Sequence, residues 1–170
     1  AHGIVKHRAP RGQLRLLGSL LQKMDAAGDR EALFREICLI GTYVKRRCNL
    51  RLIEQAGGGI SMEDLTLSFG DMAACLADMG VGTGVRCGVG EDPEPGFALL
   101  SLDVFEFLLE YERFRPEYAA AEFGPGPSFS VVIRSRSARE GAMPGRELRG
   151  MCRQAVCTAV PGGYVVTLDR

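Results

Sequence analysis

The chain has 170 residues, of which 46% are apolar and 25% charged, a mixture that excludes wholesale disorder. Its 21 basic residues balance 21 acidic ones, which argues against a uniformly basic nucleic-acid binder. No apolar run approaches the ~20 residues that a membrane helix needs, so we expect no membrane segment in this chain, although a longer parent protein with an anchor stays open.

The charges are distributed unevenly along the sequence. Residues 1–57 contain 11 basic and 5 acidic residues, whereas residues 58–170 contain 10 and 16. The change falls at three consecutive glycines, residues 57–59, which are the clearest linker signal in the chain. We therefore predict two domains, residues 1–57 and residues 58–170. The first is small for a self-sufficient core, so we expect it to associate with a second copy.

The first domain reads as two helices joined by a tight turn near residue 27. One apolar stripe runs from Leu14 to Met24 and another from Leu33 to Leu52. A lone hairpin of two ~25-residue helices cannot bury both stripes, but two hairpins form a four-helix bundle. The sequence thus predicts a homodimer whose seam contains Leu14, Leu17, Leu21, Ile37, Ile40 and Val44.

The second domain alternates helical and extended patterns. Helices are expected at Met62–Met79, Leu99–Phe114 and Arg146–Ala155, and strands at Val85–Val89, Phe129–Arg134, Val156–Val160 and Tyr164–Leu168. This order indicates helices packed on one face of a mixed sheet, and hence an α+β chain: a helical hairpin followed by an α/β sandwich.

Two histidines and many cations fall at one end of the predicted hairpin. If the helices are antiparallel, residues 45–53 lie beside residues 2–10. One interpretation is a phosphoryl-transfer site, because imidazole supplies a nucleophilic nitrogen and cations offset phosphoryl charge. The other is a solvated helix end with ordinary surface histidines. The residues concerned are His2, His7, Lys6, Arg8, Arg11, Lys45, Arg46, Arg47, Asn49 and Arg51.

Two segments carry a family resemblance. The stretch from His2 to Met24 resembles the phosphoacceptor helix of two-component sensor histidine kinases, with a histidine followed by spaced leucines. The stretch from Thr42 to Leu50 resembles the second dimerisation helix of bacterial sensor kinases with a Y-[IV]-K-R-x-x-N-L signature. The resemblance implies that His2 is the phosphoacceptor and that the second domain is a kinase-like ATP-binding domain. It also implies a response regulator receiver domain as partner.

The same resemblance also shows positions where this sequence departs from the family's catalytic and nucleotide-binding motifs. Gly3 stands where the family places an acid that accepts a proton, and His7 stands where relatives carry a residue that positions water for phosphatase chemistry. Glu106 and Glu110 match an E-x-x-x-N helix in which the family's Asn ligates magnesium, so the expected Asn is replaced by an acid. That acid would repel nucleotide phosphates. The family's D-x-G-x-G turn is missing after the strand that ends near residue 136. We therefore expect a degenerate nucleotide site, no cofactor, poor binding of ATP with Mg²⁺, and no autokinase activity.

Other glycine and cysteine patterns have simpler explanations. Asp78–Gly82 spells D-x-G-x-G, but it precedes the Glu106 helix and ends another, so we predict a glycine helix cap. Six cysteines lack paired zinc-site spacing, which predicts no metal and reduced cysteines in a cytoplasmic protein.

Three functions stay open at this point. The first is phosphoryl transfer between His2 and a regulator aspartate, and the second is a pseudokinase that dimerises and binds partners without chemistry. The third is a non-catalytic dimeric ligand-binding or scaffold protein, which an acid-free pocket lined by Phe105, Leu109 and Phe129 would favour.

Overall fold

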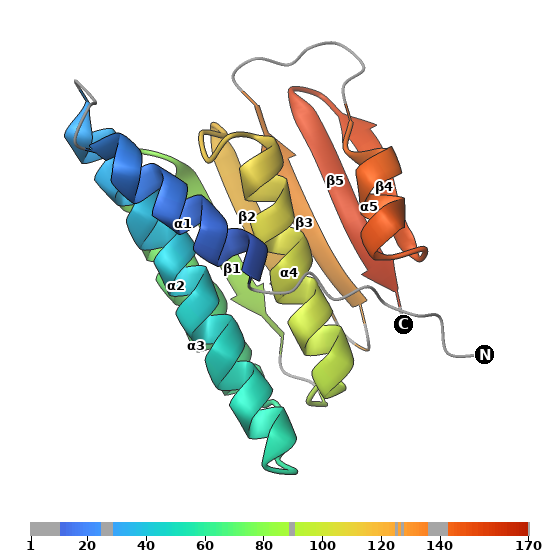
Figure 1. The fold of residues 1–170 in the computed structure, drawn as a ribbon. Coiled ribbons are helices and arrows are strands. Elements are labelled where there is room, and N and C mark those ends of the chain that lie inside the picture. Colours follow the sequence, from blue (N-terminus) through green and yellow to red (C-terminus); the bar gives the residue numbers. More distant parts are fainter. Residues whose placement is uncertain are drawn as a thin grey trace.

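The computed structural model describes residues 11–24, 29–88, 91–124, 126, 128–135 and 143–169. This part of the chain contains five helices and five strands (Figure 1). The helices are α1 (Arg11–Met24), α2 (Arg30–Gln55), α3 (Met62–Asp78), α4 (Pro95–Tyr111) and α5 (Gly145–Met151). The strands are β1 (Gly82–Cys87), β2 (Tyr118–Phe123), β3 (Ser128–Arg134), β4 (Ala155–Val160) and β5 (Gly163–Asp169).

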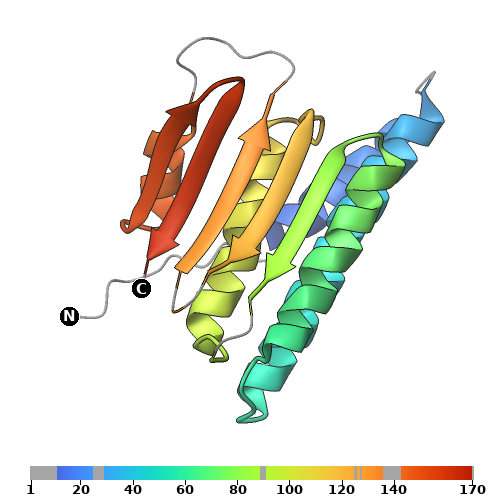
Figure 2. The ribbon, with the colours of Figure 1, turned by 180° about the vertical axis from the view of Figure 1, so that it is seen from behind.

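The five strands form one mixed sheet in the order β1-β2-β3-β5-β4. β1 runs parallel to β2, and the other neighbours are antiparallel. Figure 1 shows α4 in front of the sheet, and Figure 2, from behind, shows strands with no helix over them. The expected α+β architecture, with helices on one face of a mixed sheet, is confirmed.

Alternate residues of the central strands face the helices and form the core. Phe123 on β2 and Phe129 on β3 are buried on this face. The ring of Phe69 on α3 lies 5.4 Å from that of Phe105 on α4, 5.6 Å from Phe123 and 5.5 Å from Phe129. This aromatic cluster joins two helices to the sheet, and such ring pairs contribute beyond their buried area.

Several element boundaries differ from the sequence expectation. α2, with 26 residues, matches the expected ~25, and α1 is described over 14 residues, with residues 1–10 and 25–28 outside the described part of the chain. α4 begins at Pro95, ahead of the expected Leu99, because proline suits the first turn of a helix. β2 was not predicted, because its sequence Tyr-Ala-Ala-Ala-Glu-Phe has little β propensity. Pairing with β1 and β3 on its two sides determines it.

The glycine cap predicted at Asp78–Gly82 is confirmed. Gly80 has a φ of +77°, and its N–H donates to the carbonyl of Ala77 at 2.9 Å. The N–H of Val81 donates to the carbonyl of Leu76 at 3.0 Å, which completes a Schellman motif. These glycines therefore end α3.

All six cysteines lie in the described part of the chain, and all are free thiols. Cys48 is exposed, Cys152 is buried and the other four are half-buried. None of the described helices is long and apolar enough to cross a membrane.

The hairpin of α1 and α2 packs on the rest of the molecule. Leu39 and Ile40 of α2 belong to the same apolar cluster as the helix-facing side of the sheet. Ile40 is 0% exposed within the single chain, so its expected place in a dimer seam is wrong. Leu17, Ile37 and Val44 are half-buried against the same cluster. The proposed boundary at residues 57–59 therefore lies between two parts that share a core.

The turn after α4 contains two residues with left-handed backbone. Arg113 has a φ of 53° and Phe114 a φ of 58°. Arg113 donates its N–H to the carbonyl of Glu110 at 2.8 Å, and Phe114 donates to Leu109 at 2.7 Å. Arg113 thus occupies the position of a Schellman cap that glycine usually fills, and a side chain there costs about 1–2 kcal/mol.

We predict that Arg113→Gly raises the free energy of unfolding by about 0.5–1 kcal/mol, because relief of strain outweighs the added entropy of the unfolded chain. Urea denaturation measures the change. Ala56→Gly is the matched control, because Ala56 caps α2 with an unstrained φ of −74°. Glycine there relieves no strain and adds entropy to the unfolded chain, so this variant should be less stable than the wild type. A loss of stability in both variants would contradict the assignment of strain to Arg113.

Candidate functional site

α4 carries two carboxylates in its buried part. From Ala98 to Leu109 every residue is buried except Phe107, which is half-buried. The sheet covers one side of the helix and the hairpin covers another (Figure 1). Asp103 is 0% exposed and Glu106 is 1% exposed. Buried carboxylates require partners, and the hairpin supplies them.

Asp103 binds two side chains of α2. Arg47 donates from Nε to Oδ1 of Asp103 at 2.7 Å and from Nη2 to Oδ2 at 3.1 Å, which makes a bidentate ion pair. Tyr43 donates its hydroxyl to Oδ1 at 2.8 Å. Tyr43 and Arg47 are one helical turn apart, so both reach the same carboxylate. This three-residue group is called the α2–α4 clamp below.

The clamp fixes the protonation of Tyr43 and Arg47. Burial is the main cause that raises the pKa of Tyr43, and the negative charges of Asp103 and Glu106 raise it further. Burial alone would lower the pKa of Arg47, but the hydrogen bond and the charge of Asp103 raise it. Tyr43 therefore stays neutral and Arg47 stays cationic.

Glu106 binds α1 instead. Gln13 donates from Nε2 to both carboxylate oxygens of Glu106, at 3.2 Å each. Gln13 is 1% exposed, and its Oε1 atom is buried with no hydrogen-bond partner in the described part of the chain. The N-terminal end of α1 consequently lies against the middle of α4, as Figure 1 shows.

The cations predicted to ring a phosphoryl site are largely engaged elsewhere. Arg47 is inside the clamp, and Arg46 donates from Nε to Asp71 of α3 at 2.7 Å. Arg51 pairs with Glu54 on its own helix. Lys45 and Asn49 are exposed. Of the predicted cations on α2, three are thus bound to carboxylates.

The other predicted site residues fall into two groups. His2, Lys6, His7 and Arg8 lie outside the described residues, as does the side chain of Arg11. Glu106 and Glu110 lie one turn apart on α4, and Glu110 is half-buried. In the described part of the chain no three His, Cys, Asp or Glu side chains are close enough to hold a metal ion.

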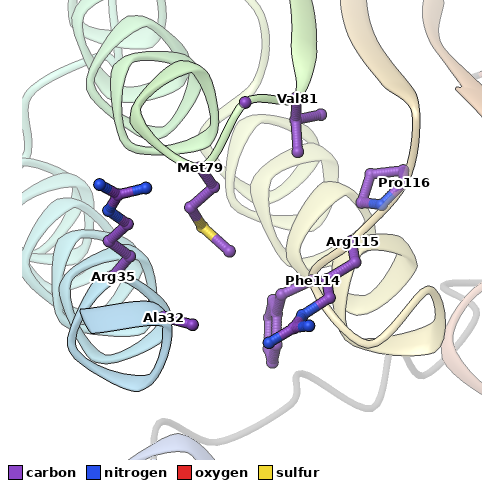
Figure 3. Close-up of a pocket in the computed structure, with 8 residues that line it drawn as sticks. Ala32, Arg35, Met79, Val81, Phe114, Arg115 and Pro116 are labelled. Carbon is purple, nitrogen blue, oxygen red and sulfur yellow. The ribbon is translucent and has the colours of Figure 1, made fainter. Parts of the chain in front are cut away.

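The acid-free pocket that would have favoured the third function is not formed by the residues named for it. Phe105, Leu109 and Phe129 are at most 1% exposed and fill the core. A hollow of about 210 Å³ lies elsewhere, between the start of α2, the α3–β1 connection and the turn after α4 (Figure 3). It is lined by Ala32, Arg35, Met79, Gly80, Val81, Phe114, Arg115 and Pro116.

The sequence contained faint signals for the residues that were missed. Asp103 and Glu106 are acids within an almost entirely apolar helix, and Gln13 is a polar residue beside a run of leucines. Acids at such positions are buried only with partners. Their partners are more than 50 residues away in the sequence, so periodicity could not find them.

The chain was compared with known proteins. No family model and no curated protein matches it. The histidine kinase domain from the blue-light activated histidine kinase of Erythrobacter litoralis is similar over 96% of this chain and 85% of that one, with 12% identity and a TM-score of 0.52. The longer structure of that kinase gives 13% identity and a TM-score of 0.39, with 98% of this chain and 63% of that one covered. The structure of a bacterial phosphotransferase gives 11% identity and a TM-score of 0.44, with 93% of this chain and 88% of that one covered.

The likeness to the histidine kinase domain of Erythrobacter litoralis shows that this chain has a histidine-kinase-like fold. The family resemblance read from the sequence is therefore confirmed at the level of the fold.

We predict that Asp103→Asn lowers the free energy of unfolding by about 3–5 kcal/mol, because it leaves the buried Arg47 without its counter-charge. The control is Asp71→Asn, which breaks the more exposed pair with Arg46 and should cost at most about 1 kcal/mol. Urea denaturation of both variants measures the difference. Equal losses would show that the clamp is no more important than a surface ion pair.

Proposed function

We propose that this chain is a two-component signalling module that does not phosphorylate itself from ATP. It acts by dimerisation and by passing phosphoryl groups between His2 and an aspartate of a response regulator receiver domain. In this step the P–O bond of an aspartyl phosphate breaks, a P–N bond forms on the imidazole, and the imidazole proton passes to solvent. The histidine-kinase-like fold supports the proposal.

The position of Glu106 carries the part of the proposal that concerns ATP. In the resemblance, the face of α4 with Glu106 and Glu110 would bind the nucleotide and its magnesium. Here Glu106 is buried and accepts both hydrogen bonds from Gln13. The clamp holds the hairpin against the same helix. A nucleotide would have to displace α1 to reach this carboxylate.

The engagement of the arginines changes the proposed phosphoryl environment. Arg46 and Arg47 are bound to Asp71 and Asp103, so their charges are already offset. Asn49 is exposed and can face a receiver domain, whereas Lys45 lies within the exposed stripe proposed below as the dimer seam. Among the α2 residues singled out from the sequence, Asn49 is the proposed contact. His7 keeps its proposed auxiliary role in the loss of phosphate from the partner.

An exposed stripe on the hairpin supports dimerisation. Leu14 and Leu21 on α1 are 54% and 53% exposed, and Phe34 and Leu52 on α2 are 55% and 63% exposed. Residues at this surface repeat with alternating spacings of three and four, the pattern of a coiled-coil seam. The proposed seam consists of Leu14, Gly18 and Leu21 on α1 with Phe34, Cys38, Gly41, Lys45, Cys48 and Leu52 on α2.

We predict that the wild-type chain sediments as a dimer and that the double variant Leu14→Asp, Leu21→Asp sediments as a monomer. Both leucines are more than half exposed, so the folded monomer should keep its stability to within about 1 kcal/mol. Ser19→Asp places a charge at another exposed position of α1 and should leave the dimer intact. A double variant that remains dimeric would place the interface elsewhere.

The phosphotransfer proposal is tested with a receiver domain labelled on its aspartate. We predict that the wild-type chain takes up label and that His2→Ala takes up none, because the nucleophilic nitrogen is gone. His7→Ala should still take up label and should mainly change the rate at which the receiver loses phosphate. Incubation with ATP labelled on its γ-phosphate should leave the wild type unlabelled. Strong Mg²⁺-dependent labelling from ATP would contradict the proposed loss of autokinase activity.

The hollow in Figure 3 favours the alternative, a non-catalytic dimeric ligand-binding or scaffold protein. It lies between the hairpin and the turn after α4, and two arginines line it. A ligand there would contact both parts of the chain. Stable binding to the receiver domain with no label reaching His2 would leave the pseudokinase, whereas no binding to any receiver domain would leave this alternative.

A further inference from the structure

The hollow between the start of α2 and the turn after α4 combines an apolar wall with two cations. Its apolar side chains are those of Ala32, Met79, Val81, Phe114 and Pro116. Its charged side chains are those of Arg35 and Arg115, and no acid is among the described residues that line it. In the view of Figure 3, the side chain of Met79 lies between those of the two arginines. Such a surface suits a ligand that has both an apolar body and a negative charge.

Both arginines keep hydrogen-bond donors for such a ligand. Arg35 pairs with Glu31 at 2.5 Å, and Arg115 pairs with Glu36 at 3.4 Å. Each of these ion pairs joins one guanidinium nitrogen to one carboxylate oxygen, whereas a guanidinium carries five N–H donors. The side chains of Arg35 and Arg115 are 42% and 65% exposed, and exposed ion pairs are weak. A second anion can therefore bind to either group.

The backbone donors around the hollow are already used. The N–H groups of Gly80 and Val81 donate to carbonyls of α3, and those of Phe114 and Arg115 donate to the carbonyls of residues 109 and 112. A phosphate group has three strong acceptor oxygens and would need more donors than the guanidinium groups supply. A carboxylate matches the planar fork of a guanidinium. The chemistry of the hollow thus favours a carboxylate over a phosphate.

One wall of the hollow is the strained turn after α4. Arg113 and Phe114 both have left-handed backbone, with φ of 53° and 58°. Strain of this kind is found preferentially at binding sites, where it positions side chains. Here the turn places two consecutive residues, Phe114 and Arg115, on the hollow. The same strained turn therefore supplies part of the apolar wall and one of the two charges.

We propose that this hollow binds a small organic carboxylate with an apolar body. The body packs against Met79, Val81 and Phe114, and the carboxylate pairs with the guanidinium groups of Arg35 and Arg115. The volume of about 210 Å³ is below the range of about 300–1,000 Å³ that is typical of sites for drug-sized ligands, so the ligand is small. The site refines the alternative function as a ligand-binding protein and does not rest on phosphoryl transfer.

An NMR titration with phenylacetate tests the site on the full chain, and the ε-methyl signal of Met79 is the reporter. Phenylacetate has about ten non-hydrogen atoms, so we expect a saturable shift with a dissociation constant on the order of 1 mM. Phenylacetamide has the same shape without the charge and should bind at least about tenfold more weakly. The methyl signal of Met143, which is exposed and outside the hollow, should not shift.

Two double variants test the charges. Arg35→Gln, Arg115→Gln removes both cations from the hollow and should weaken the binding of phenylacetate at least about tenfold. The matched control is Arg51→Gln, Arg86→Gln, which removes two exposed arginines that are also ion-paired but do not line the hollow. This control should bind phenylacetate as the wild type does. Both double variants should fold, because exposed ion pairs add little to stability.

A third variant tests the hollow itself. Ala32→Leu keeps both arginines, and its larger side chain fills part of the space toward which Ala32 points in Figure 3. It should weaken the binding of phenylacetate about tenfold, because a filled cavity has no room for the aromatic ring. Unchanged binding in this variant would show that phenylacetate binds outside the hollow and would overturn the proposal.

The remaining outcomes also decide the proposal. The absence of a saturable shift of the Met79 methyl at about 10 mM phenylacetate would overturn it, since that is about ten times the expected dissociation constant. Equal binding of phenylacetate and phenylacetamide would overturn the role of the charges, and this comparison on the wild type decides even if a variant fails to fold. None of these results depends on label reaching His2, so the site and the phosphotransfer proposal can fail separately.

Discussion

The bidentate ion pair between Arg47 and Asp103 is the interaction on which the arrangement of this molecule depends. Both side chains are almost completely buried, at 6% and 0% exposure. Each charge would be costly to bury alone. The packing of α2 against α4 is therefore stable only when Arg47 and Asp103 are paired with each other. Tyr43 adds a second hydrogen bond to the same carboxylate. The clamp therefore specifies which faces of the two helices meet, in addition to the apolar packing around it.

Because the hairpin is fixed on α4, the two sides of the hairpin have different roles. One side of α1 and α2 is committed to the core, where Gln13 and Arg47 bind carboxylates of α4. The opposite side carries the exposed stripe that we propose as the dimer seam. A second ion pair, between Arg46 and Asp71, holds α2 to α3. Consecutive arginines thus attach one helix to two neighbours, and the hairpin and the sheet are expected to move as one body.

The sequence predicted most of the architecture because its signals are local. The apolar periodicity of α2 and α3 and the cap at Gly80 depend on nearby residues, and both helices were found close to their observed bounds. β2 was missed because its three alanines acquire their extended conformation from the strands on both sides. The histidine-kinase-like fold was inferred from weak motifs and is supported by a solved domain at 12% identity.

The candidate site could be predicted only in part, because its decisive contacts are distant in sequence. Arg47 was placed on a solvated, cationic helix end, yet its partner is 56 residues further along the chain. Nothing in the spacing of the three basic residues 45–47 distinguishes the buried one from the exposed Lys45. Glu106 was chosen as a degenerate nucleotide ligand, and its burial under α1 depends on where the whole hairpin docks.

Native-state hydrogen exchange tests the docked hairpin most directly. If the clamp holds α2 on α4, the amides of α2 around Tyr43 and those of β3 around Val131 should exchange with similar free energies of opening, close to that of global unfolding. Exchange in α2 that is many-fold faster than in β3, under conditions where the protein is fully folded, would show that the hairpin undocks by itself. That result would contradict the account.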